Sequence, residues 1–104
     1  MREICLVHLD KTRPALVLTR EGARGAMTKV TVAPITSTVK GLSSEVRLGP
    51  HNGLDHTCAV ALDNVVTVPR TMLGRTVGYL TVQQEAELAR AVVLAYDLDL
   101  PLLD

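Results

Sequence analysis

The polar segment Lys11-Thr12-Arg13-Pro14 stands between two apolar runs and carries the first side chains that could do chemistry. A guanidinium is always protonated and offers several N–H donors, which suits it to phosphate oxygens. Pro14 restricts the backbone beside Arg13 and stiffens the point from which the arginine projects. By its spacing alone, the segment fits a solvated turn arginine better than a functional one, so Arg13 needs support from other residues.

Hydroxyl and amide side chains follow two further apolar runs. Thr36, Ser37 and Thr38 come after one of them and could hydrogen-bond a phosphate or a base edge, or could satisfy the backbone of a turn. Asp63 and Asn64 separate two others. Such a pair usually marks a turn, but it could also read base edges or orient an arginine.

The other reactive residue types form no recognisable site. His8, His51 and His56 fit no zinc spacing, and Cys5 and Cys58 allow at most one disulfide and make no CxxC pair. The chain has no phosphate-binding glycine loop, no HExxH and no GxSxG motif. We therefore expect neither a metal nor a cofactor.

Short strands must position the candidate side chains. Apolar alternation bounded by turn residues predicts strands, mostly antiparallel, at residues 4–9, 14–19, 29–35, 42–48, 57–62, 65–68 and 76–80. The first two strands should form a tight hairpin. We predict a loop over 20–28 and turns at 49–53 and 73–75.

The pattern changes near the end of the chain. Thr81 and Gln84 have the spacing of a capping box, and Leu88, Val92 and Ala95 recur at helical intervals. We predict a helix from Thr81 to about Asp97. A mainly β protein follows, a small barrel or curled sheet closed by one C-terminal helix.

Composition restricts the class of protein. With 104 residues we expect one domain over 1–104. Aromatic residues make up only 2%, which argues against modules that stack RNA bases on several rings. The net charge is zero, but residues 1–80 hold ten Lys/Arg against six Asp/Glu, and 81–104 hold one against five. The basic part could meet a polyanion. With no membrane-spanning stretch and no signal sequence, we expect a cytoplasmic protein.

The order of these motifs is more specific than any one of them. The segments are Leu9-Asp10-Lys11-Thr12-Arg13-Pro14-Ala15-Leu16-Val17-Leu18, Val32-Ala33-Pro34-Ile35-Thr36-Ser37-Thr38, Leu62-Asp63-Asn64, Thr67-Val68-Pro69 and Leu73-Gly74-Arg75, followed by the capped helix. Over nearly its whole length the chain resembles the MazF/PemK family of toxin endoribonucleases, which is well represented among mycobacterial toxins.

The resemblance implies a fold, an activity and partners. The fold would be an SH3-like barrel of the PemK/CcdB type with a C-terminal helix, assembled as a homodimer. The activity would be sequence-specific, metal-independent cleavage of single-stranded RNA (mRNA, tRNA or rRNA) to 2′,3′-cyclic phosphate and 5′-hydroxyl ends, which inhibits translation and growth. A MazE-type antitoxin would neutralise it. By position, Arg13 and Thr36 match the family's catalytic residues.

The resemblance also suggests further RNA contacts, and the chain departs from the family pattern in two places. The polar residues around the two catalytic positions are candidates for phosphate or base contacts: Lys11, Thr12, Ser37, Thr38, Lys40, Asp63 and Asn64. Asp63 or Asp10 could instead orient Arg13. The loop between the first two strands is shorter than in most relatives, and Ala61 stands where some of them have arginine. No general base is assigned.

Two readings from other classes compete. One is a protein-binding poison on the same scaffold, like the gyrase-directed CcdB toxins, because fold alone does not determine activity. The other is a non-catalytic SH3-like interaction module. Such modules bind ligands in aromatic grooves, which this chain cannot build from two tyrosines.

Overall fold

The structure is a computed structural model and describes residues 2–99. Its seven strands are β1 (Glu3–His8), β2 (Thr12–Val17), β3 (Lys29–Thr36), β4 (Glu45–Leu48), β5 (Cys58–Ala61), β6 (Val66–Pro69) and β7 (Leu73–Tyr79). Its helices are α1 (Glu21–Arg24) and α2 (Val82–Ala95), and three short 3-10 turns cover Pro50–Asn52, Leu62–Asn64 and Arg70–Met72.

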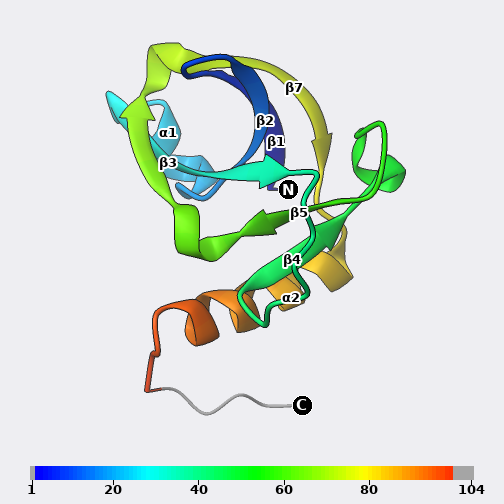
Figure 1. Cartoon of the computed structure of the whole chain (residues 1–104). Coiled ribbons are helices and arrows are strands. Elements are labelled where there is room, and N and C mark those ends of the chain that lie inside the picture. Colours follow the sequence, from blue (N-terminus) through cyan, green and yellow to red (C-terminus); the bar gives the residue numbers. More distant parts are fainter. Residues whose placement is uncertain (1, 100–104) are drawn as a thin grey trace.

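The strands form one strongly curled antiparallel sheet. Its order is β4-β5-β3-β2-β1-β7, and β6 pairs with β3 outside this path. The long β3 is shared, since its first half pairs with β6 and its second half with β5. Figure 1 shows the sheet wrapping into a barrel with α2 beneath it. The predicted mainly β barrel with a C-terminal helix is confirmed.

Both faces of the curled sheet are buried, in two separate apolar clusters. The barrel cluster consists of Cys5, Val7, Ala15, Val17, Val30, Val32 and Val68. The helix cluster consists of Ile4, Leu16, Ala33, Ile35, Val46, Leu48, Cys58, Val60, Leu62, Leu80, Leu88 and Ala91. Because successive strand residues point to opposite faces, the central strands β1, β2 and β3 contribute to both clusters in alternation. This explains why the central strands are apolar at nearly every position.

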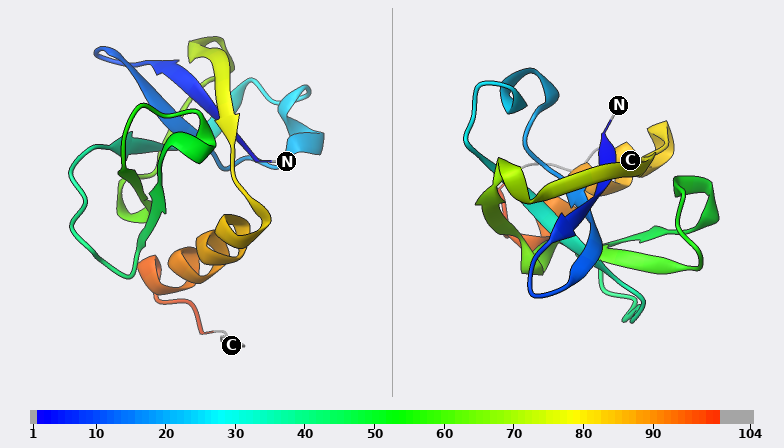
Figure 2. Two further views of the ribbon diagram at one scale, coloured as in Figure 1. Left: turned by 90° about the vertical axis from the view of Figure 1, so that its right-hand side faces the viewer. Right: turned by 90° about the horizontal axis from the view of Figure 1, so that it is seen from above.

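Helix α2 begins as predicted and covers one end of the sheet. Thr81 is the N-cap, and its hydroxyl accepts a hydrogen bond from the Gln84 backbone N–H at 3.1 Å. In return, the Gln84 side-chain oxygen accepts a hydrogen bond from the Thr81 backbone N–H. Leu88 and Ala91 pack into the helix cluster. Figures 1 and 2 place α2 below the barrel, under β4. The helix ends at Ala95, two residues before the predicted end. No helix in the range 2–99 is long and apolar enough to cross a membrane.

A buried amide ties the loop between β4 and β5 to the rest of the fold. The Asn52 side chain is 1% exposed, donates to the Tyr79 carbonyl at 2.9 Å and exchanges hydrogen bonds with Gln84. Gly53 has φ +82° and lies against the backbone of Val77 in β7. The loop is therefore fixed to β7 and to the start of α2.

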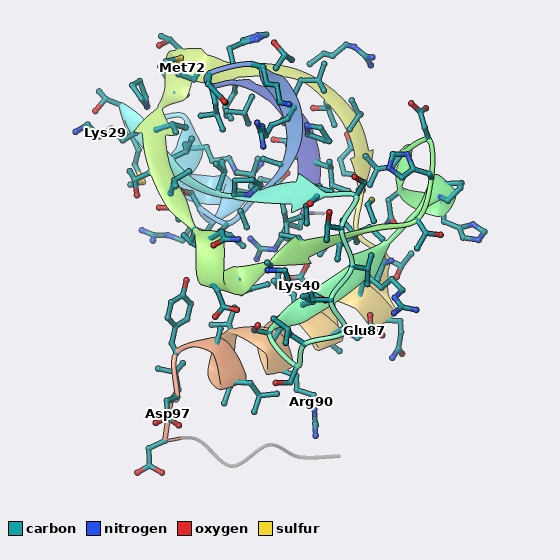
Figure 3. The ribbon with its side chains drawn as sticks, in the orientation of Figure 1. Lys29, Lys40, Met72, Glu87, Arg90 and Asp97 are labelled. Carbon is teal, nitrogen blue, oxygen red and sulfur yellow. The ribbon has the colours of Figure 1, made fainter. Side chains whose placement is uncertain are left out.

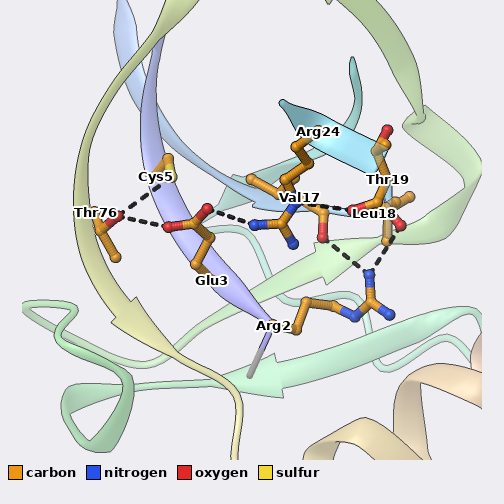
Figure 4. Close-up of polar contacts among 8 residues, drawn as sticks. All are labelled: Arg2, Glu3, Cys5, Val17, Leu18, Thr19, Arg24 and Thr76. Carbon is orange, nitrogen blue, oxygen red and sulfur yellow. Dashed lines mark hydrogen bonds and ion pairs between the residues drawn. The ribbon is translucent and has the colours of Figure 1, made fainter. Parts of the chain in front are cut away.

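The segment over 20–28, expected to be a loop, contains the short helix α1. Arginines hold it in place: Arg24 bonds the Thr19 carbonyl and pairs with Glu3 of β1, while Arg70 donates to the carbonyls of Arg24 and Gly25. Figure 4 shows how Arg24 and Glu3 connect this segment to β1. These long-range contacts order a stretch whose two glycines suggested irregular backbone.

Three strands differ from the prediction by two residues or more at a boundary, and the other four differ by one residue. Strand β2 spans 12–17, not 14–19, because Val7 and His8 of β1 pair with Arg13 and Thr12. Strand β4 starts only at Glu45, whose carboxylate bonds the backbone of the preceding loop. The predicted turn at 73–75 lies inside β7, since pairing with β1 extends to Leu73 and the turn falls at 70–72.

Candidate active site

The sheet register brings Arg13 and Thr36 to adjacent positions. Ala15 lies opposite Pro34 and Val17 opposite Val32 in the antiparallel pair β2–β3. The paired residues end at Ala15 and Pro34, and extending the same register by two residues sets Arg13 opposite Thr36. Both lie on the face that carries the barrel cluster, where their strands leave the apolar interior. A cation and a hydroxyl therefore stand side by side at one end of the barrel.

The Arg13 guanidinium has a partner at one nitrogen, Nη2, and none at another, Nε. Its Nη2 donates to the Asp10 carboxylate at 3.4 Å, at the long end of the hydrogen-bond range, and its side chain is 34% exposed. Its Nε–H is buried without a hydrogen-bond partner. A buried donor without an acceptor costs about 1–3 kcal/mol. The Arg13 guanidinium therefore carries one N–H, on Nε, that no described group satisfies.

Thr36 is the last residue of β3 rather than the first residue after it. Its Oγ1 accepts the Thr38 backbone N–H at 3.1 Å, which turns the chain away from the sheet. A hydroxyl that accepts one bond keeps its own proton free to donate. Thr36 can thus offer an O–H to an oxygen bound beside Arg13.

The hairpin residues Lys11 and Thr12 are exposed, and of the two, Thr12 has a side-chain partner among residues 2–99. The Thr12 hydroxyl lies 3.0 Å from His8 Nδ1, its cross-strand neighbour. Because Thr12 and Arg13 are consecutive in a strand, His8 belongs to the face opposite Arg13. His8 is therefore not placed to exchange a proton with a group bound at Arg13.

Ser37, Thr38 and Lys40 lie in the exposed loop that leaves Thr36, with Lys40 marked in Figure 3. The Glu45 carboxylate organises the end of this loop by accepting the backbone N–H groups of Lys40, Gly41 and Leu42. The Lys40 side chain remains exposed and positively charged beside the strand ends.

Asp63 and Asn64 are exposed in the 3-10 turn after β5. The Asp63 carboxylate accepts the buried Ser44 hydroxyl, and the Leu62 N–H donates to the Ser44 carbonyl at 3.0 Å. Asp63 therefore holds the start of β4, whereas the carboxylate that pairs with Arg13 is that of Asp10. The sequence left open whether Asp10 or Asp63 orients Arg13. In this structure, Asp10 is the carboxylate that contacts the guanidinium.

The cysteines are free and buried, so they are not nucleophiles. Burial raises the pKa of the Cys5 thiol and outweighs the Thr76 hydrogen bond and the Arg24 charge, which lower it, and burial also raises the pKa of the Cys58 thiol. Both thiols stay protonated at neutral pH. Over residues 2–99, no three His, Cys, Asp or Glu side chains gather closely enough to hold a metal ion.

Sequence reasoning missed Arg47. The alternation of β4 predicts that Val46 and Leu48 share a buried face and that Glu45 and Arg47 face the other way, which the burial pattern confirms. Nothing in the local sequence shows what lies beside Arg47. The sheet register does: Arg47 pairs with Ala59, and Ala59 pairs with Thr36.

The fold and site define a class of small curled β-barrel with a cation and a hydroxyl at one end. Residues 2–96 match the PemK-like, MazF-like toxins of type II toxin–antitoxin systems, and the chain belongs to this family. It is 52% identical to the Mycobacterium tuberculosis endoribonuclease MazF3 over 95% of this chain and 96% of that protein.

Solved structures agree with this assignment. The Mycobacterium tuberculosis toxin MazF-mt6 is 50% identical, with a TM-score of 0.92 over 95% of this chain and all of that one. A mycobacterial endoribonuclease in complex with its cognate antitoxin is 22% identical, with a TM-score of 0.84 over 95% of both chains. At that identity the second likeness concerns the fold alone.

Proposed function

We propose that this chain is an endoribonuclease toxin that cleaves single-stranded RNA at Arg13 and Thr36. Its family and its curated relatives, named as endoribonucleases, support this reading over a protein-binding poison on the same fold. The observation that carries the site assignment is the buried, unpartnered Nε–H of Arg13 in register with the Thr36 hydroxyl.

The proposed reaction is an internal phosphoryl transfer. The RNA 2′-oxygen attacks the adjacent 3′-phosphorus and loses its proton, the bond from phosphorus to the 5′-oxygen breaks, and that oxygen takes up a proton. The products are a 2′,3′-cyclic phosphate and a 5′-hydroxyl. Negative charge grows on the non-bridging oxygens in the transition state, where the Arg13 guanidinium and the Thr36 hydroxyl can donate to them.

The chain supplies electrostatic stabilisation more clearly than proton transfer. Arginine stays protonated in proteins, so Arg13 is a poor general base but can donate to the leaving 5′-oxygen. Asp10 holds the guanidinium and limits its freedom. Lys11, Thr12, Ser37, Thr38, Lys40 and Asn64 border the site as candidate phosphate or base contacts. Asp63, bonded to Ser44, is a candidate for a base contact only through its free carboxylate oxygen.

The proposed partners follow from the family. Its members are toxins of type II toxin–antitoxin systems, so we propose a MazE-type antitoxin for this chain, a homodimeric assembly and a cytoplasmic location. Exposed apolar side chains on α2 and after it, among them Leu94, Tyr96 and Leu98, are available for such contacts.

One assay tests the function. Purified protein is incubated with a mixed-sequence single-stranded RNA in EDTA, and the ends are mapped. We expect cuts at a short recurring motif, with 2′,3′-cyclic phosphate and 5′-hydroxyl ends. Cuts that vanish in EDTA would identify a metal-dependent nuclease. An absence of cuts with any RNA would favour the protein-binding poison.

Thr36→Val tests the hydroxyl separately. Valine matches the shape of threonine, so β3 and its neighbours should keep their packing while the O–H donor is lost. We expect kcat to fall about 10²-fold, the scale for one transition-state donor, with KM within a few-fold of wild type. Thr71→Val, at an exposed threonine in the 3-10 turn before β7, is the matched control. Equal losses in both variants would contradict a specific role for Thr36.

A further inference from the structure

The row of side chains that contains Arg13 and Thr36 continues across the sheet. Thr36 of β3 pairs with Ala59 of β5, and Ala59 pairs with Arg47 of β4. Paired residues of neighbouring strands point to the same face. Arg13, Thr36, Ala59 and Arg47 therefore form one line over four adjacent strands, with an arginine at each end.

The two arginines at the ends of this line are too far apart to contact the same nucleotide. Arg47 lies two strand spacings from Thr36, or about 10 Å between backbones. Ala59 is fully buried and places only a methyl group between them. Arg47 and Ala59 also line a groove of about 940 Å³ that runs along β4 toward α2. An extended strand bound at Arg13 and Thr36 would reach Arg47 by crossing the side chains that cover Ala59.

Arg47 is available for such a contact. Its side chain is exposed and forms no ion pair with any residue in the range 2–99. Glu45, the other outward residue of β4, is occupied by three backbone N–H groups of the preceding loop. The Arg47 carbonyl accepts the Gln84 side chain at 3.2 Å, which fixes its backbone to α2. The backbone of Arg47 is therefore fixed, and no ion pair within residues 2–99 neutralises its charge.

We propose that Arg47 binds a phosphate of the RNA that flanks the scissile one, so that the substrate site extends over β5 to β4. This inference rests on the proposed function, since it assumes RNA at Arg13 and Thr36. Arg47 is a binding residue in it and takes no part in bond breaking. If Arg47 has this role, its removal should raise KM, weaken the salt dependence of KM and abolish the sensitivity to neutralisation of one phosphate only.

The test combines Arg47→Ala with RNA carrying a single neutral methylphosphonate at each position in turn. We expect Arg47→Ala to raise KM about tenfold, the scale of one charge-assisted hydrogen bond, with kcat within about twofold. The slope of log KM against log salt should shrink by about 0.7, as for one lost phosphate contact on a single strand. Neutralising one flanking phosphate should weaken wild-type binding and leave Arg47→Ala unaffected.

Controls separate the possible failures. Arg20→Ala removes an exposed arginine beyond the opposite end of β2 and should leave KM unchanged. Arg47→Lys keeps the charge and should recover part of the binding. The inference would be overturned if Arg47→Ala had the same KM as Arg20→Ala. It would also be overturned if Arg47→Ala responded like the wild type to neutralisation of every phosphate. If wild-type protein cuts no RNA, the proposed function itself fails.

Discussion

Replacing Arg13 by alanine is expected to lower kcat for RNA cleavage by about 10³-fold or more, the scale found when a single transition-state arginine is removed. The β2–β3 register, extended by two residues, sets this guanidinium opposite Thr36. Folding stability should change by less than about 1 kcal/mol, because the variant also removes a buried Nε–H that had no partner. Cleavage is measured under single-turnover conditions and stability by urea denaturation.

Two companion variants define what the arginine does. Arg13→Lys keeps the charge but loses the fork of donors, so intermediate activity is expected. Asp10→Asn removes the ion pair at 3.4 Å and should reduce kcat far less, since Asp10 only orients the guanidinium. Cleavage at the wild-type rate by a folded Arg13→Ala protein would remove Arg13 from the site.

Gly53→Ala is expected to destabilise the fold by about 2–5 kcal/mol, from a left-handed backbone and from overpacking. Gly53 has φ +82°, and a Cβ there would lie 1.9 Å from the Val77 carbonyl oxygen. Gly78 meets the same loop from the other side, since its Cβ would lie 1.8 Å from the Asn52 carbonyl. The loop and β7 touch backbone to backbone, so neither can shift cheaply.

Gly22→Ala is the matched control. Gly22 lies in α1, and a Cβ there would meet nothing within 4 Å. This variant should be neutral or stabilising by about 0.5–1 kcal/mol, because alanine restricts the unfolded chain and suits a helix. Both proteins are compared by the midpoint of urea denaturation at constant m-value. Equal midpoints for the two variants would contradict the close backbone approach.

Much of the fold could be predicted because its pattern is local. The capping box at Thr81 and Gln84 determines where α2 begins, and the alternation in β4 determines which residues are buried. The boundaries that failed depend on distant partners. Arg13 belongs to a strand because Val7 pairs with it, and α1 is ordered because Arg24 reaches Glu3.

The sequence by itself determined the family, the strands and the two residue types of the candidate site, because these follow from motif order and from alternation along the chain. Only the tertiary structure decided which side chains are neighbours. Pairing of β2, β3, β5 and β4 places Arg13, Thr36 and Arg47 in one line, although 34 positions separate the two arginines. Register is a property of strand pairs, and a shift of one residue would send each of these side chains to the other face.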